Sequence, residues 1–141
     1  MFRRPSRGPV SLPRMIASLQ TQVLNCPEPR ALALFYARLL GGEVDRPDPR
    51  WALGEDFATL HLPGGAVLSF QRDPGFRAPT WPAPGVPVQS HLDLGVRDLD
   101  AAERVAVAAG ARRLPTAAGI VGWRVYADPA GHVFCLVREH G

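Results

Sequence analysis

The sequence predicts an α+β fold built from two copies of a strand–helix–strand–strand–strand module, abbreviated βαβββ. Two observations predict this fold. Each half of the chain begins with a strand pattern that runs into an amphipathic helix pattern. Later in each half, the segments 57–72 (FATLHLPGGAVLSFQR) and 123–138 (WRVYADPAGHVFCLVR) align without a gap, and both read as strand–turn–strand. Such self-similarity is the signature of an internal duplication.

The first helix is expected over Glu28–Leu40, after a strand over 17–25. Pro29 suits the first helical turn, and the pair Gly41–Gly42 ends the helix. Apolar residues recur at the spacing that places them on one buried face of this helix. These residues are Leu32, Phe35, Tyr36, Leu39 and Leu40.

The second half of the chain repeats this order of elements. A strand is expected over 90–96, and Asp98 is a suitable N-cap for a helix that ends at Gly110. Short strands near 43–53 and 111–115 fill the interval between helix and hairpin in the two halves. The hairpin turns are expected at Pro63–Gly64–Gly65 and at Pro129–Ala130–Gly131.

The chain is expected to form one domain over 15–141, because a length of 141 residues suits a single core. Its two modules span 17–72 and 89–138, and a proline-rich linker, 73–88, joins them. Residues 1–14 (MFRRPSRGPVSLPR) carry prolines and arginines without apolar periodicity, so we expect a disordered basic tail.

The composition excludes several classes of function. All 16 basic residues are arginine, which excludes a Schiff-base lysine mechanism. Several of these arginines lie in the tail, and the rest of the chain lacks the basic stripe of a nucleic-acid surface. We therefore expect no nucleic-acid partner. Because no segment reaches membrane-spanning length, we expect no membrane partner either. The two cysteines, Cys26 and Cys135, form no metal or disulfide motif, which favours a reducing cytoplasmic location.

The stretch 90-SHLDLGVRD-98 holds the main candidate site residues. Leu92 and Leu94 alternate with His91 and Asp93, so the imidazole and the carboxylate share the strand face opposite the core. That face is either exposed to solvent or lines a pocket. The linker offers a second candidate, Trp81, because the linker is either a plain connection or a stiff loop that lays its aromatic residues over a cavity.

Three motifs together resemble one superfamily. FYARLLGG follows the first strand, HLDLGVRDLDAAE opens the second module, and YADPAGHVFCLV closes it. The combination resembles the vicinal oxygen chelate superfamily, which includes glyoxalase I, bleomycin-resistance proteins and extradiol dioxygenases. It looks most like the glyoxalase-like domain proteins of high-GC bacteria such as actinobacteria. The resemblance covers about 17–138 and predicts the fold more specifically than the reaction.

The resemblance implies a fold in which each module curls into a half-open sheet, with the helices outside and a small-molecule cavity on the concave face. It also implies a homodimer. The metal enzymes of the superfamily take ligands from the first and last strands of both modules, positions that correspond here to Thr21, Ser69, His91 and Cys135. Threonine and serine hydroxyls are poor ligands for a divalent ion. We therefore expect no metal and no cofactor.

The implied cavity assigns roles to further residues. We expect His91, Asp93 and Cys135 to be the catalytic candidates. His91 either supports the sheet, orients a ligand or acts as a general acid or base beside Asp93. Cys135 is either an apolar filler or a thiolate nucleophile paired with His91. The expected ligand-binding residues are Thr21, Asn25, Ser69, Gln71, Trp81 and Val133.

Two functions remain open at this point. The first is a protein that binds a small drug-like or aromatic metabolite, because no residue pattern requires chemistry. The second is a lyase or isomerase, independent of metal or with an atypical metal, in which His91 is the general acid or base.

Overall fold

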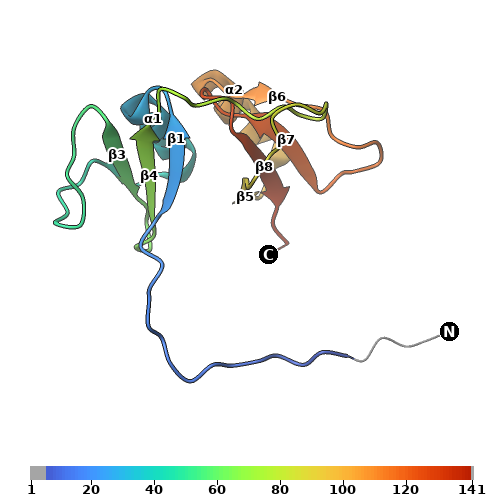
Figure 1. Ribbon diagram of the computed structural model, residues 1–141. Coiled ribbons are helices and arrows are strands. Elements are labelled where there is room, and N and C mark those ends of the chain that lie inside the picture. Colours follow the sequence, from blue (N-terminus) through green and yellow to red (C-terminus); the bar gives the residue numbers. More distant parts are fainter. Residues whose placement is uncertain (1–5, 141) are drawn as a thin grey trace.

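The structure, a computed structural model, describes residues 6–140 and contains two four-stranded sheets (Figure 1). Their strand orders are β1-β4-β3-β2 and β5-β8-β7-β6. Module 1 comprises β1 (Gln22–Cys26), α1 (Pro29–Leu40), β2 (Glu43–Val44), β3 (Phe57–His61) and β4 (Val67–Arg72). Module 2 comprises β5 (Leu92–Val96), α2 (Leu99–Ala109), β6 (Arg112–Arg113), β7 (Trp123–Ala127) and β8 (Val133–Arg138).

The first strand of each module lies parallel to the last strand, and the remaining pairs are antiparallel. The predicted α+β class with tandem βαβββ modules is therefore confirmed. The register repeats too: Gln22 pairs with Leu68 in module 1, and Leu92 pairs with Phe134 in module 2. Equivalent positions of the two modules can thus be compared residue by residue.

Several predicted boundaries differ from the structure. The first strand begins at Gln22, not at residue 17, because β4 begins at Val67, opposite Thr21, and offers no partner for residues 17–20. The strand expected near 43–53 ends at Val44, because Asp45 turns the chain away with a φ of 56°. The helix predicted after Asp98 is confirmed, and the Asp98 carboxylate caps it by accepting a hydrogen bond from the Ala101 N–H at 3.1 Å.

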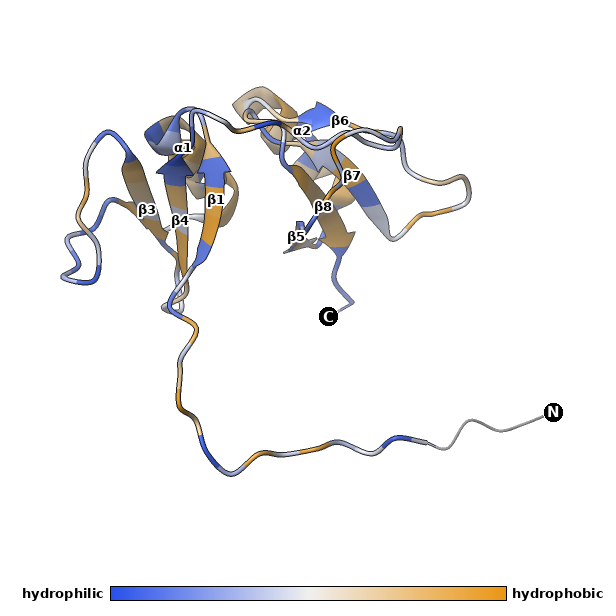
Figure 2. Cartoon of the chain, viewed as in Figure 1, coloured by the Kyte–Doolittle hydropathy of each residue, from blue (hydrophilic) through white to orange (hydrophobic). Residues whose placement is uncertain are grey.

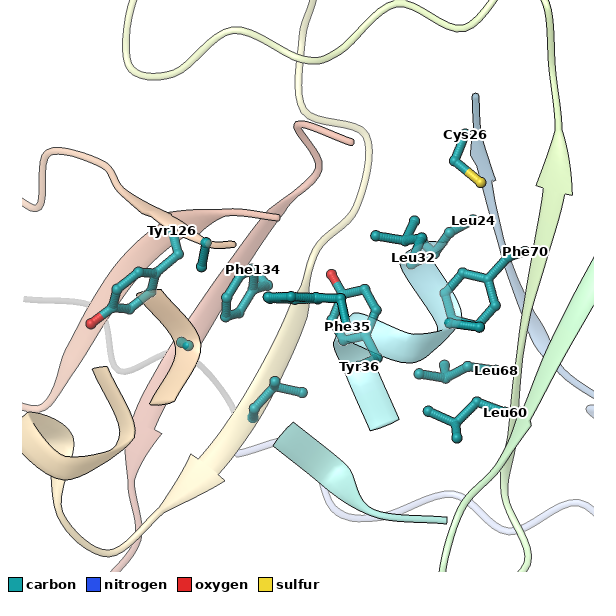
Figure 3. Close-up of a cluster of buried hydrophobic side chains, with 14 of the residues drawn as sticks. Leu24, Cys26, Leu32, Phe35, Tyr36, Leu60, Leu68, Phe70, Tyr126 and Phe134 are labelled. Carbon is teal, nitrogen blue, oxygen red and sulfur yellow. The ribbon is translucent and has the colours of Figure 1, made fainter. Parts of the chain in front are cut away.

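One aromatic core joins the two modules. Helix α1 lies between the sheets, and Figure 3 shows its Phe35 and Tyr36 between Phe70 of β4 and Phe134 of β8. The ring centroids of Phe35 and Phe134 are 5.8 Å apart, and those of Tyr36 and Phe70 are 6.0 Å apart. Because Tyr126 stacks on Phe134 in turn, a single layer of rings runs through both modules.

Two polar contacts reinforce this junction. The Tyr36 hydroxyl donates a hydrogen bond to Asp128 Oδ2 at 2.6 Å, and both groups are buried. Burial raises the pKa of the Asp128 carboxyl, and burial together with the Asp128 charge raises the pKa of Tyr36. The Nε2 atom of His132 lies 2.6 Å from the backbone carbonyl of Asn25, which ties module 2 to β1. The modules therefore share one core.

The helices cover one face of each sheet, and the opposite face is the concave one. Figure 2 shows β8 apolar along its length, because its alternate residues face the core and the opposite, concave side. The segment 6–20 is exposed, without helix or strand, and extends away from both modules (Figure 1). The predicted tail overlaps this segment, and its residues 1–5 lie outside the described part. Across 6–140, every helix is too short or too polar to span a membrane.

Candidate functional site

The concave face of module 2 gathers three chemically active side chains. His91 directly precedes β5, Asp93 lies in β5, and Cys135 lies opposite Asp93 in the parallel strand β8. His91 and Asp93 point the same way because they are two residues apart in an extended segment. His91 Nε2 lies 3.2 Å from Asp93 Oδ1, and the donor atoms of all three residues lie within 4.8 Å of one another.

Burial differs across this group. The side chains of His91 and Asp93 are 46% and 62% exposed, whereas Cys135 is buried. Burial, followed by the negative charge of Asp93 and a hydrogen bond to it, raises the pKa of the Cys135 thiol to about 11. Cys135 therefore keeps its proton at neutral pH. This gives no support to a Cys135 thiolate nucleophile in the protein alone.

A cavity of about 410 Å³, here named the module 2 cavity, opens beside this group. Two indole rings border it: Trp81 from the linker and Trp123 from β7, each a little over 40% exposed. The indole N–H of Trp81 donates to the Pro115 carbonyl at 2.9 Å, which fixes the ring over the sheet. The cavity is lined by Trp81, Val88, His91, Asp93, Trp123, Val125, Val133, Cys135 and Val137.

The equivalent positions in module 1 hold different chemistry. The repeated register makes Thr21, Val23 and Ser69 the counterparts of His91, Asp93 and Cys135. Thr21 Oγ1 and Ser69 Oγ lie 2.8 Å apart and share a hydrogen bond, and the Thr21 hydroxyl is also 2.9 Å from the Val67 carbonyl. Their hydrogen-bonding capacity is used within module 1.

The loop 45–56 contacts this module 1 face through Asp45, Asp48 and Trp51. Its Asp48 carboxylate lies 3.1 Å from Nε2 of His61, a histidine that is only 6% exposed, and the Trp51 ring packs edge-on against the same imidazole. Asp45 Oδ1 accepts a hydrogen bond from the Thr59 N–H at 3.0 Å. The loop is therefore bonded to β3 on this face.

The structure brings five of the predicted site residues to one cavity: His91, Asp93, Cys135, Trp81 and Val133. The other four lie elsewhere in this chain, and their ligand-binding roles stay predictions. Thr21 and Ser69 bond to each other in module 1, Gln71 is exposed near the end of β4, and Asn25 borders a separate hollow of about 360 Å³ between β1 and the linker.

Some lining residues escaped the sequence prediction. Trp123 and Val125 occupy alternate positions of β7, so strand periodicity could have identified them once β7 was assigned. Val88 belongs to the linker, where no periodicity exists, and only the folded arrangement reveals it.

The metal-ligand set implied by the superfamily does not fit this chain. Two of its four positions, Thr21 and Ser69, carry hydroxyls that bond to each other and do not line the cavity beside His91 and Cys135. Neutral hydroxyls are weak donors for a divalent ion.

The fold is shared with solved structures of low sequence identity. A glyoxalase/bleomycin resistance protein/dioxygenase family enzyme from Burkholderia phytofirmans is 18% identical, covers 86% of this chain and 98% of its own, and has a TM-score of 0.62. A mutant of the fosfomycin resistance protein FosX from Listeria monocytogenes, complexed with Mn(II) and a dihydroxypropylphosphonic acid, is 15% identical, covers 87% and 90%, and has a TM-score of 0.63.

A third structure, of a protein from Agrobacterium tumefaciens, is 20% identical, covers 89% of this chain and all of its own, and has a TM-score of 0.63. At such identities these likenesses show the fold alone. No curated protein matches the chain. The family comparison is decisive, because the model described as glyoxalase-like domain matches residues 21–137, most of the sequence. The chain therefore belongs to the glyoxalase-like domain family of the vicinal oxygen chelate superfamily.

Proposed function

We propose that this protein binds a small, planar and largely apolar molecule, such as an aromatic metabolite or a drug-like compound, in the module 2 cavity. The observation that carries the proposal is the pairing of two tryptophans with a valine-rich floor. A volume of about 410 Å³ suits a small ligand, and apolar walls with a few polar groups are typical of such sites.

The polar groups of the cavity suggest how a ligand would be oriented. Asp93 and His91 stand together and partly exposed, so a ligand N–H or O–H can donate to the Asp93 carboxylate. Trp81 is held by its bond to Pro115, and it offers an indole face for stacking at little cost in side-chain freedom. The favoured ligand is therefore an aromatic ring that carries a hydrogen-bond donor.

Tryptophan fluorescence tests this proposal, because only two of the 3 tryptophans line the cavity. A thermal-shift screen of small aromatic compounds supplies hits, and each hit is titrated against the chain. We expect the ligand-induced fluorescence change to persist in Trp51→Phe and to shrink in Trp81→Phe and Trp123→Phe. Trp81→Ala should weaken binding about tenfold. A change that vanishes only in Trp51→Phe would place the ligand on module 1 and contradict the proposal.

The contact of 3.2 Å between His91 and Asp93 favours one alternative, a lyase or isomerase with His91 as general acid or base. The neighbouring Asp93 carboxylate can orient the His91 ring toward a substrate. His91→Gln separates the two functions. A binding protein should lose affinity modestly, whereas an enzyme should lose turnover of its substrate by about 10²–10⁴-fold.

The proposal includes a homodimer in the cytoplasm. Strands β1 and β5 are edge strands, and exposed edges favour pairing with a second copy. Sedimentation equilibrium of the full chain checks this point, and a monomer at micromolar concentration would reject it. The cytoplasmic location is supported by Cys26 and Cys135, which are both free thiols.

A further inference from the structure

We propose that His91, Asp93 and Cys135 form a binding site for one zinc ion, or for a similar soft divalent ion. They offer an imidazole nitrogen, a carboxylate oxygen and a sulfur, and these atoms lie within 4.8 Å of one another. Within residues 6–140 this is the one group of three such side chains close enough to share an ion. The inference does not depend on the proposed function, since it concerns the metal alone.

The strands hold the three residues where a metal needs them. Asp93 and Cys135 are direct partners in the parallel pair β5–β8, and His91 precedes Asp93 by two residues on the same face. A zinc ion with bonds of about 2.0–2.3 Å keeps neighbouring donors roughly 3.5 Å apart. Rotation of the His91 and Asp93 side chains can supply a shift of this size, because both are partly exposed.

The donor types select the metal. Thiolate and imidazole favour zinc and other soft or borderline ions, whereas magnesium and calcium prefer sites made entirely of oxygen. On binding, the Cys135 S–H bond breaks, a sulfur–zinc bond forms, and the proton passes to water. The resulting thiolate and the Asp93 carboxylate then balance the double positive charge. Three protein ligands leave a fourth position facing the module 2 cavity.

This site differs from the ligand set that the superfamily resemblance implies. All three donors come from module 2, and Asp93 is not one of the implied positions. The expectation of no metal counted only His91 and Cys135 as suitable donors. The structure adds Asp93 as the third, at 3.2 Å from His91. Module 1 carries valine at the equivalent position, Val23, so the duplicated module cannot form the same site.

Cobalt titration of the full chain, first stripped with a chelator, tests the inference. Cobalt replaces zinc in such sites, and a thiolate ligand produces an intense charge-transfer absorption. We expect this absorption to saturate at one cobalt per chain and to be displaced by zinc. It should vanish in Cys135→Ala and persist in Cys26→Ala, which removes the other buried cysteine. Absorption that survives in Cys135→Ala, or never appears in the native chain, overturns the proposal.

Variants of the two partly exposed metal-binding side chains give a second test, because such substitutions are not expected to unfold the protein. Asp93→Asn and His91→Ala change partly exposed side chains, and we expect each to weaken zinc binding by at least about tenfold in equilibrium dialysis. His140→Ala, near the C-terminus, is the control and should bind as the native chain does. Equal zinc affinity in all three variants overturns the site. A cobalt spectrum without any ligand-induced fluorescence change would reject only the proposed function.

Discussion

The concave faces of the two modules share a register but differ in what covers them. In module 1 the loop 45–56 lies on the sheet and supplies Asp48 and Trp51 as partners for His61. In module 2 the linker's Trp81 stands over the sheet, and a cavity of about 410 Å³ remains beneath it. The module 1 face is therefore partly filled by its own loop (the filled face), and the module 2 face retains the module 2 cavity (the hollow face). The difference shows that segments outside the sheets help to decide which face keeps a cavity.

The largest predicted effect concerns the core that both faces share. Phe134→Ala should lower the free energy of unfolding by about 3–5 kcal/mol, because a fully buried ring between α1 and Tyr126 is lost. Urea denaturation followed by far-UV circular dichroism measures the loss. Since α1 packs against both sheets, one transition is expected. A second transition, in which Trp51 fluorescence still reports a native module 1 after module 2 has unfolded, would show that the modules unfold independently.

The buried bond between the modules should have the next largest effect. Tyr36→Phe removes the donor to Asp128 Oδ2 and leaves that buried carboxylate oxygen with one partner fewer. We expect a loss of about 1–3 kcal/mol in thermal or urea unfolding. Tyr126→Phe is the matched control, because its hydroxyl bonds within module 2 to the partly exposed Glu103. Equal losses in the two variants would mean that the buried bond between modules contributes no more than the partly exposed bond within module 2.

A third prediction concerns the filled face. The Thr59 hydroxyl is buried, and no hydrogen-bond partner for it lies within residues 6–140. Thr59→Val keeps the shape and removes this group, so stability should rise by up to about 1 kcal/mol. Thr21→Val should instead lower stability by about 1 kcal/mol, because it breaks the bond to Ser69. Differential scanning calorimetry measures both, and a lower melting temperature for Thr59→Val would contradict the prediction.

The smallest effect is expected from pH, through the loop over module 1. Hydrogen bonds from Arg50 and then from His61 hold the pKa of Asp48 well below its usual range. A carboxylate with a lowered pKa in the folded state stabilises the fold above its unfolded pKa of about 3.9 and loses that contribution as the pH falls. The urea midpoint difference between the native chain and Asp48→Asn should therefore shrink below about pH 4. A constant difference would exclude this role.

The sequence predicted the duplication well because periodicity and turns are local signals. The gapless alignment of 57–72 with 123–138 reappears as two hairpins in identical register. Strand periodicity also put His91 and Asp93 on one face, and the superfamily resemblance added Cys135. Periodicity does not tell which faces meet. The superfamily resemblance groups Thr21 and Ser69 with His91, whereas the structure places them together in module 1. That grouping depends on how the modules pack. Asp93 as a third metal donor likewise needed the side-chain positions.

One wall of the hollow face comes from the linker, 73–88, between the modules. Trp81 and Val88 belong to neither sheet, and the Trp81 indole donates its hydrogen bond to the carbonyl of Pro115. Substitutions in this linker can therefore reshape the entrance to the module 2 cavity without disturbing the aromatic rings of the core. Under the proposed function, changes at these few linker positions alter which compound binds and leave the aromatic core as it is.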